Sequence, residues 1–365
     1  MKFRAERDVL LEALGTAGRA ATTRGGMSPV LSGIRLEVRD DHLQLAASDL
    51  DVTVQVEVDV VGEQPGVCVI PAKLAIDIVR AMDPGAVSVS AEEGEAVIAA
   101  GRSQFGVRLL PAEEFLPLPT VPDEHVSIAS AELRTALEQV VRAASRDDAR
   151  PILTGVLMEA EVGGLRLVAT DSYRLAMRDL PGTTLLAEGQ KVLIPGRALG
   201  ELTRLLSGGD KPVEMRLGAD EASFDVGRSR LTTRLLDGEF PDYRQLIPSN
   251  YPNRLVVGRE PLLDAVRRVK LLARDAAPVR MTLRTGGLEL LAVTQDVGQA
   301  TEDVDAKYEG SEMMVAFNPE FLIEGVEAMR GEEVLLETLD ALKPATLRPT
   351  DGTDYLYLLM PVRVT

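Results

Sequence analysis

Few side chains in this sequence could carry out acid–base, nucleophilic or metal chemistry. The 365 residues include two histidines, His42 and His125, and one cysteine, Cys68. Neither histidine has a cysteine, a second histidine or paired carboxylates at metal-ligand spacing, so we interpret His42 as a turn residue and His125 as a surface residue of a connector. Cys68 lies in an apolar, strand-like run, which is typical of a small buried hydrophobe rather than a nucleophile.

Two acidic residues occupy equivalent places in a repeated segment, but they do not predict a metal site. Asp49 and Asp171 correspond to Gln295 in the third copy, so turn or capping hydrogen bonds explain them better than a metal ion does. The sequence contains neither a P-loop nor a Gly-x-Ser-x-Gly motif. We therefore predict no catalytic residues, no metal and no cofactor. An enzyme is kept as the main alternative class, which nuclease or nucleotide-hydrolysis activity of the pure protein would reveal.

The chain repeats one unit three times. Residues 45–49 (Leu-Ala-Ala-Ser-Asp) recur as 167–171 and, more weakly, as 291–295. A strand end followed by a proline that can open a helix recurs at residues 69–74, 193–197 and 316–321. Each landmark shifts by about a third of the chain, which is a domain-sized period. We predict three homologous domains, at residues 1–120, 127–248 and 253–365.

Each repeat begins with an amphipathic helix, and a second such helix follows the proline. The remaining residues form short alternating strands that are separated by turns, so the predicted fold class is α+β, with two helices per domain backed by antiparallel sheet. The stripes of the first helices are Leu10, Leu14, Ala17 and Ala21; Leu133, Leu137, Val140 and Ala144; and Leu262, Val266, Val269 and Ala273.

Charge is distributed unevenly along the chain. The net charge of −17 taken alone argues against nucleic-acid binding, because duplex phosphates repel an acidic surface. For a single helix, a solvated face with local ion pairs is the simplest interpretation of its cations. The same bias in three repeats instead predicts a positive lining that follows phosphates without reading bases. The cations are Arg19, Arg24, Lys73, Arg80, Arg134, Arg142, Arg146, Arg150, Arg197, Arg204, Arg267, Arg268, Lys270 and Arg274.

Four segments resemble the beta sliding clamp family of bacterial replicative DNA polymerases. They are residues 169–176, residues 236–243, Phe-Asn-Pro at 317–319 and Met-Pro-Val-Arg at 360–363. The resemblance implies three tandem DNA-clamp domains and a head-to-tail homodimeric ring with six-fold pseudo-symmetry. Such a ring encircles double-stranded DNA without sequence specificity, is loaded by a clamp loader and serves the polymerase. No membrane span or signal-peptide core is visible in the sequence, so we expect a cytoplasmic protein.

The resemblance also implies a pocket between the second and third domains for short peptides of the polymerase, the clamp loader, other polymerases and repair proteins. Tyr173, Gln245 and Val362 depart from residues common in the family, and we expect them to alter peptide preference without abolishing docking. The implied pocket residues are Arg150, Leu153, Thr170, Ser172, Tyr173, Arg174, Leu175, Pro241, Leu246, Phe321, Leu358, Met360, Pro361, Val362 and Arg363.

Two further sets of residues follow from the resemblance. Arg24, and then Arg150 and Arg197, are the expected DNA contacts. The subunit contact is expected to join Lys73, Phe105 and Val107 of one chain to Leu271, Leu272 and the acids Asp296, Glu302 and Asp303 of the other. A clamp-like paralogue without a replicative role and a monomeric scaffold that never closes are the alternatives left open.

Overall fold

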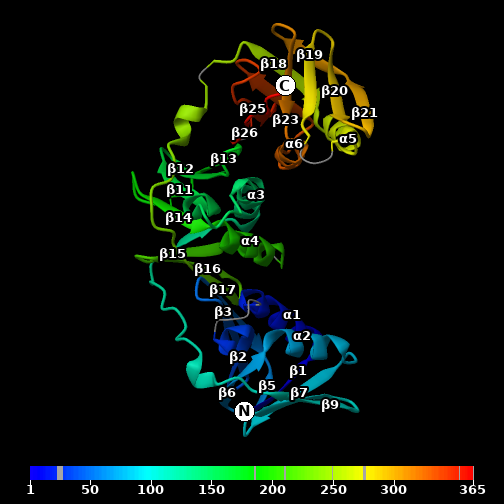
Figure 1. Cartoon of the computed structure of the whole chain (residues 1–365). Helices are drawn as coiled ribbons and strands as arrows, with labels where there is room; N and C mark the ends of the chain where they lie inside the picture. The colour runs from blue at the N-terminus through cyan, green and yellow to red at the C-terminus, as the bar shows by residue number, and fades with distance from the viewer. Residues whose placement is uncertain are drawn as a thin grey trace. The chain divides into compact units, whose positions relative to one another are not determined.

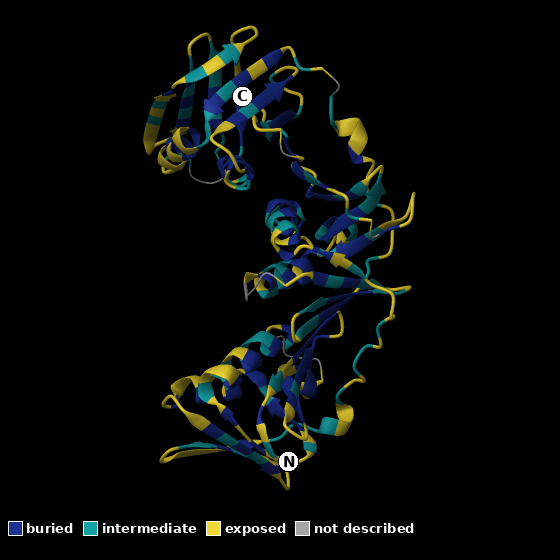
Figure 2. Cartoon of the chain, turned by 180° about the vertical axis from the view of Figure 1, so that it is seen from behind, coloured by how far each residue is buried: buried dark blue, intermediate teal, exposed yellow. Residues whose placement is uncertain are grey.

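The structure is a computed structural model that describes residues 1–22, 28–184, 186–208, 211–248, 250–273, 277–352 and 354–364. It divides into two compact units. The first unit consists of Met1–Ala131 and Glu201–Leu235, and the second consists of Glu132–Gly200 and Leu236–Thr365 (Figure 1). Buried residues lie on the strands and on the helix sides that face them, whereas exposed residues gather on turns and connectors (Figure 2). Each unit is described by itself below.

The order of helices and strands repeats three times, as the sequence predicts. The first repeat contains β1 (Lys2–Glu6), α1 (Arg7–Ala17), β2 (Gly33–Arg39), β3 (His42–Ser48), β4 (Val52–Asp59), β5 (Val61–Gln64), β6 (Gly66–Pro71), α2 (Ala72–Ala81), β7 (Ala86–Glu92), β8 (Glu95–Ala100) and β9 (Ser103–Arg108). The second contains β10 (Val126–Ile128), α3 (Ser130–Val140), β11 (Gly155–Glu161), β12 (Gly164–Thr170), β13 (Arg174–Pro181), β14 (Lys191–Pro195), α4 (Gly196–Leu205), β15 (Val213–Leu217), β16 (Glu221–Val226) and β17 (Ser229–Arg234). The third contains β18 (Asn253–Gly258), α5 (Arg259–Lys270), β19 (Val279–Arg284), β20 (Gly287–Thr294), β21 (Gly298–Val304), β22 (Ala306–Glu309), β23 (Met313–Phe317), α6 (Pro319–Glu327), β24 (Glu333–Thr338), β25 (Ala345–Pro349) and β26 (Tyr355–Leu359).

Sheets continue from one repeat into the next within each unit. The first unit contains the sheets β5-β1-β7-β8-β9 and β10-β15-β16-β17-β4-β3-β2-β6, in which β17 of the second repeat pairs with β4 of the first. The second unit contains the sheets β14-β11-β12-β13-β26-β25-β24-β18-β22 and β21-β20-β19-β23, in which β26 pairs with β13. The last strand of the second repeat, β17, thus pairs with β4 of the first, and the last strand of the third repeat, β26, pairs with β13 of the second. These pairings make each unit continuous across a repeat boundary.

The predicted apolar stripes form the contact between helices and sheets. Leu10 and Leu14 in α1, like Leu262 and Val266 in α5, are buried, and the same holds for the corresponding residues of α3. Helices α1 and α2 pack side by side in the first unit, as do α5 and α6 in the second (Figure 1). No helix within the described ranges is long and apolar enough to span a bilayer.

The predicted prolines differ in their positions. Pro319 opens α6, where the side chain of Asn318 caps the helix by accepting hydrogen bonds from the backbone N–H groups of Glu320 and Phe321. Pro71 and Pro195 instead end strands β6 and β14, and the helices begin one residue later. The sequence pattern therefore finds the strand-to-helix boundary in all three repeats, but only the third uses the proline as a helix residue.

The third copy of the repeated segment is shifted by one residue from its predicted alignment. Leu45 is fully buried, whereas its predicted counterpart, Leu291, is only partly buried. The two sequence neighbours of Leu291, Leu290 and Ala292, are fully buried. Because successive strand residues face opposite sides, Leu290 is the true equivalent of Leu45. Thr294, and not Gln295, therefore occupies the position of Asp49 and Asp171. The predicted alignment with Gln295 was wrong.

Candidate functional site

The turn between β12 and β13 is held by the side chains of Thr170 and Asp171. The Thr170 hydroxyl donates to the carbonyl of Arg174 over 2.6 Å and accepts from the N–H of Ser172 over 3.2 Å. A carboxylate oxygen of Asp171 accepts from the N–H groups of Tyr173 and Arg174 over 2.9 and 3.0 Å. Ser172 has a positive φ of 78°, which is costly for a residue with a side chain and is sustained by these bonds. The proposed turn role of Asp171 is thereby confirmed.

Arg174 is buried at the centre of an ion-pair network. Its guanidinium donates to Asp171 over 3.0 Å, to the carbonyl of Arg142 over 2.6 Å and to the carboxylate of Glu324 in α6. Burial by itself would lower the pKa of this guanidinium, but Glu324 and Tyr357 outweigh that effect and raise it. Arg174 therefore acts as a fixed cation that joins the β12–β13 turn to α6.

Aromatic and carboxy-terminal residues gather beside this network. The guanidinium of Arg174 also lies over the ring of Phe321, which stacks against Tyr173 with 6.5 Å between ring centres. The chain after β26 runs along the same turn, because the N–H of Met360 donates to the carbonyl of Tyr173 over 2.9 Å. The N–H of Val362 then donates to Ala316 over 2.7 Å. Residues that are far apart in the sequence thus form one surface.

An apolar cluster lies beneath this surface, on the face of the nine-stranded sheet. Leu175 and Leu358 are direct partners in adjacent strands, and Met360, Phe240 and Ile152 pack against the cluster. The hydroxyl of Tyr243 donates to Glu159, and burial raises the pKa of this tyrosine to about 12. The cluster also contains residues absent from the predicted set. These are Leu157, Val168, Met177, Leu193, Leu236, Ile247 and Leu356.

The predicted pocket residues divide into a supporting group and a surface group. Leu153, Thr170, Arg174, Leu175 and Leu358 are buried, so their side chains hold the surface from below. The others are exposed or partly exposed; they are Arg150, Ser172, Tyr173, Pro241, Leu246, Phe321, Met360, Pro361, Val362 and Arg363. Glu324 was missed and Arg142 was predicted only as a lining cation, because no local pattern reveals that α6 approaches the β12–β13 turn. Phe240 and Tyr243 were within a segment singled out in the sequence and could have been included.

The helices are nearly neutral instead of positive. The six α-helices of the described chain carry ten Lys or Arg residues and eleven Asp or Glu residues. Nearly all of the net charge of −17 therefore lies outside them. Many helical cations are paired with acids nearby, for example Arg134 with Glu138 over 2.8 Å. The predicted positive lining is thus weaker than the positions of the arginines suggested.

The three expected DNA contacts have different surroundings. Arg24 lies outside the described residues, and so does Arg274. Arg197 is exposed in the first turn of α4. Arg150 is exposed, pairs with Asp147 over 3.0 Å and donates to the hydroxyl of Ser172 over 3.3 Å. Arg150 thus belongs to the same surface as Tyr173.

The expected subunit-contact residues lie on or near two edge strands, β9 in the first unit and β21 in the second. Phe105 on β9 is 40% exposed, whereas Val107 is 2% exposed and packs inside its own unit. Leu271, at the end of α5, is 76% exposed, while Leu272 is only partly buried. Lys73 is exposed in α2. Phe105, Leu271 and Lys73 are therefore exposed, Leu272 is partly exposed, and Val107 is buried.

The two histidines and the cysteine singled out in the sequence lie in different surroundings. His42 is the first residue of β3 and not a turn residue; strand pairing brings it within 3.6 Å of Glu57 and 3.3 Å of Asp59. Sequence spacing did not reveal this neighbourhood, but all three side chains are more than half exposed. Within the described ranges, no group of His, Cys, Asp or Glu side chains is suited to hold a metal ion. Cys68 is buried, which raises the pKa of its thiol to about 12.

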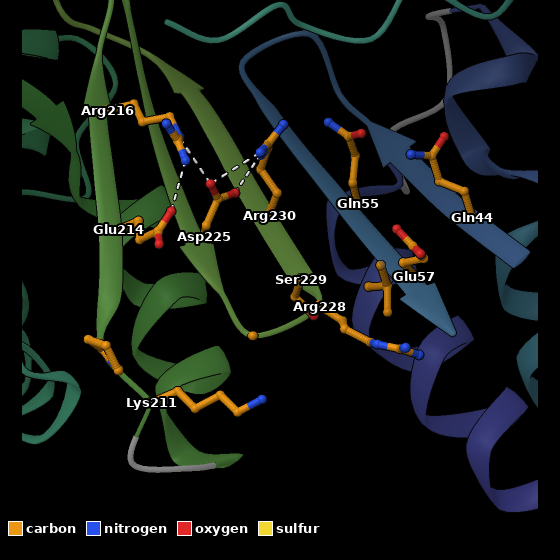
Figure 3. A pocket seen from close by; sticks show the side chains of 13 residues that line it. Gln44, Gln55, Glu57, Lys211, Glu214, Arg216, Asp225, Arg228, Ser229 and Arg230 are labelled. Carbon is orange, nitrogen blue, oxygen red and sulfur yellow. Dashed lines mark hydrogen bonds and ion pairs between the residues drawn. The ribbon is translucent and has the colours of Figure 1, made fainter. Parts of the chain in front are cut away.

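A polar hollow of about 570 Å³ lies on the sheet of the first unit (Figure 3). Asp225 on β16 accepts from Arg216 on β15 and Arg230 on β17, over 3.0 and 2.5 Å. Burial by itself would raise the pKa of Asp225, but these two arginines outweigh it and hold the pKa below its usual range. Arg216 also donates to the carbonyl of Asp123, which fixes the connector before β10. The polar lining of the hollow is thus explained by the ion pairs on this face of the sheet.

Three tandem copies of one α+β unit, joined by sheets that continue between repeats, define the class of clamp-fold proteins. The N-terminal, central and C-terminal domain models of the DNA polymerase III beta subunit match residues 1–119, 127–242 and 244–363. The chain is similar to the beta sliding clamp of Streptomyces coelicolor, with 35% identity over all of both chains. It is also similar to sliding-clamp crystal structures from Bartonella birtlesii (31% identity, TM-score 0.95) and Bacillus subtilis (28% identity, TM-score 0.93), each covering 100% of both chains. The chain belongs to the bacterial beta sliding clamp family.

Proposed function

We propose that the chain closes head-to-tail with a second copy into a ring around double-stranded DNA and tethers the replicative polymerase to its template. One observation carries the proposal. Phe105 on β9 corresponds to Leu231 on β17 and Tyr357 on β26. Both counterparts are 0% exposed and lie on strands paired with the preceding repeat, whereas Phe105 is 40% exposed on an edge strand. A strand and an aromatic residue placed this way need a partner.

The partner strand follows from the same repeat. Strands β4 and β13 receive β17 and β26, and their counterpart in the third repeat is β21, which is also an edge strand. Pairing β9 of one copy with β21 of the next repeats the internal junction and closes a ring of six similar domains. By analogy with these internal junctions we expect Phe105 to lie opposite Ala300, because Leu231 pairs with Val54 and Tyr357 with Ala176.

The expected contact residues fit this pairing. Gly298 on β21 lies beside Leu272, since a Cβ at Gly298 would meet a methyl group of Leu272 at 4.0 Å. Leu271 and Leu272 therefore lie at the end of the strand that would receive Phe105. The candidate partners of Lys73 are Glu302 and Asp303 on β21 and Asp296, which lies just before β21. Glu302 and Asp303 already pair with Arg268 and Arg284 in their own chain, so Asp296 is the best candidate for an ion pair across the interface.

Encirclement makes strong contacts with DNA unnecessary. A closed ring leaves a duplex only by opening, so nearly neutral helices that neither repel phosphates strongly nor bind them tightly suit sliding. We assign DNA contacts to Arg24, Arg150 and Arg197, without sequence specificity, since phosphate contacts carry no base information. We assign the ring no catalytic step, no metal and no cofactor, and place it in the cytoplasm with the chromosome.

The surface around Tyr173, Phe321 and Met360 is our proposed docking site for short peptides of the polymerase, the clamp loader, other polymerases and repair proteins. Its support is an apolar cluster under an aromatic pair, with methionine and arginine at the rim, which suits a peptide that carries a hydrophobic anchor. We place it between domains spanning residues 127–248 and 253–365, with residues 1–120 as the remaining domain.

Primer extension by the cognate polymerase tests the replicative role. With its clamp loader and ATP, the chain should increase the length of DNA made in one binding event on a primed circular template. If the product length does not change although the loader is active, the replicative role is contradicted and the chain is instead a clamp-like paralogue without that role. Phe105→Glu should remove the increase by preventing ring closure, and Val162→Glu, on a fully exposed turn, is the matched control.

A further inference from the structure

The first unit contains a structural counterpart of the proposed peptide-docking surface. The turn between β3 and β4 repeats the bonds that side chains accept from backbone N–H groups in the β12–β13 turn, although Ser48 bonds to the Thr53 hydroxyl where Thr170 donates to a backbone carbonyl. The hydroxyl of Ser48 accepts from the N–H of Leu50 over 3.2 Å, and Asp49 accepts from the N–H groups of Asp51 and Val52 over 3.2 and 2.9 Å. Leu50 has a φ of 84°, like the 78° of Ser172. The two turns therefore present corresponding residues in the same way.

Strand register extends the correspondence to the floor of this surface. Thr53 pairs with Thr232 as Leu175 pairs with Leu358, so hydroxyl residues replace the two leucines of the second unit. Arg234 follows in the position of Met360. The chain after β9 supplies the wall: Phe115 packs against the buried cluster of Val30, Leu31 and Val69, in the place that Phe240 takes in the second unit.

A hollow of about 320 Å³ lies at this place. Its rim is apolar at Leu50 and Leu116, which are 43% and 45% exposed. Its floor is polar, because Thr53 and Thr232 are buried and bonded to Ser48 and Ser223 over 2.8 and 3.1 Å. A pair of hydroxyls that bond to each other keeps one O–H group free to donate, which suits the carbonyl oxygens of an extended peptide.

The charged residues around this hollow differ from those of the second unit. Asp51 replaces Tyr173, and Ser28, whose hydroxyl donates to Glu114 over 3.3 Å, replaces Arg150. Among the described residues that line the hollow, the acids are Asp51 and Glu221 and the one cation is Arg234. The lining therefore carries a net negative charge, which attracts a cation and disfavours an acidic ligand.

We propose that this hollow, lined by Leu50, Asp51, Thr53, Leu116, Glu221 and Thr232, is a second docking site, for an extended peptide that carries an aliphatic residue next to Lys or Arg. The aliphatic side chain lies against Leu50 and Leu116, and the cation lies between Asp51 and Glu221. The proposed function assigns the second unit to apolar-anchored peptides, so the two sites take peptides of different chemistry. The inference rests on the proposed peptide surface as its counterpart but does not require ring closure.

Fluorescence anisotropy with the intact protein tests the site at physiological salt. The probe is a fluorescein-labelled peptide of alternating arginine and leucine residues. The variant Asp51→Lys with Glu221→Lys should weaken binding by roughly tenfold or more, and Leu116→Ser by about threefold, since few residues carry most of an interface's affinity. The matched control, Glu12→Lys with Glu92→Lys, makes the same charge change at exposed positions outside the hollow and should leave binding nearly unchanged.

Three results would overturn the proposal. Equal weakening by the control pair would show non-specific attraction to an acidic protein. Weakening only by Met360→Asp would place the probe on the second unit. An absence of saturable binding up to about 1 mM, where the binding free energy is only about −4 kcal/mol, would show that no specific site exists. Retention of the protein on circular DNA is measured separately, so failure of the ring and failure of this site are distinguished.

Discussion

The guanidinium of Arg174 lies 4.3 Å from the centre of the Phe321 ring. This contact ties the turn before β13 to the first turn of α6, and Tyr357 adds a second tie because its hydroxyl donates to the carbonyl of Phe321 over 2.9 Å. Gly325 allows α6 to lie this close, since a Cβ there would meet the Tyr357 ring at 2.4 Å. The rigidity of the proposed peptide surface therefore depends on a buried cation and a close helix.

Replacement of Arg174 by methionine should destabilise the second unit. The change leaves the Asp171 and Glu324 carboxylates without their shared cation, which costs about 3 kcal/mol when one member of a buried network is removed. The midpoint of urea unfolding measures the effect. Adding Glu324→Leu should recover part of the loss, because the uncompensated charge is then gone. An Arg174→Met variant as stable as the parent protein would contradict a stabilising role for this ion-pair network.

Replacement of Met360 by aspartate should weaken apolar-anchored peptides without unfolding the chain. Met360 is partly exposed and packs against the apolar cluster, so a carboxylate there must be desolvated when a hydrophobic anchor docks. We expect a loss of about tenfold or more in the affinity of the polymerase's own docking peptide. Arg234→Asp, at the corresponding place of the first unit, is the matched control and should bind that peptide normally.

The proposed subunit contact predicts a specific disulfide. Arg230 pairs with Gln55 and Leu356 with Met177, so the repeat places Gln104 of one copy opposite Thr301 of the next. Gln104→Cys with Thr301→Cys should form a dimer that resists SDS but not reductant, because directly opposite strand residues lie within disulfide reach. The native cysteine should not interfere, since its thiol is buried.

The matched control pairs Gln104→Cys with Asp303→Cys, two residues further along β21 on the same face of the strand. That separation exceeds the Cα distance that a disulfide spans. Equal crosslinking of both pairs, or crosslinking of the control alone, would refute the predicted register.

The ion pairs of Asp225 predict an acid-sensitive first unit. Because the folded pKa is held below its usual range, the stabilisation is present above about pH 4, the unfolded value, and is lost as the pH falls through the folded pKa. Asp225→Asn should therefore lower stability at pH 7 by about 1 to 3 kcal/mol and by less at about pH 3, which is below the unfolded pKa. Thermal unfolding at the two pH values measures this, with the exposed Asp220→Asn as control. A constant difference would argue against the ion pairs.

Single cations should matter little for sliding. Arg197→Ala removes one of several phosphate contacts, so we expect a small decrease in the salt dependence of DNA binding, of about one unit of slope. Loading by the clamp loader should be reduced more than retention. A large loss of retention on circular DNA from this one change would contradict a topological mechanism.

The repeat, the helices and most strands could be predicted from the sequence because apolar period and turn residues are local signals. The one-residue shift near Leu291 was missed because apolar residues occupy both faces of β20 there, so the sequence did not distinguish the two registers. The network of Arg174 with Glu324 was missed for a different reason. It is formed by segments about 150 positions apart, and nothing near Glu324 indicates a buried partner. Family resemblance supplied Arg174 itself but not its role.

Retention on DNA after loading tests the central proposal most directly. The protein is loaded onto nicked circular DNA, half of the sample is cut to linear form, and both are passed through a sizing column in high salt, which weakens phosphate contacts. We predict that the protein stays on the circle and leaves the linear DNA through its ends. Equal loss from both forms, with a loader shown to be active on a related clamp, would mean that binding is only electrostatic and would contradict the ring.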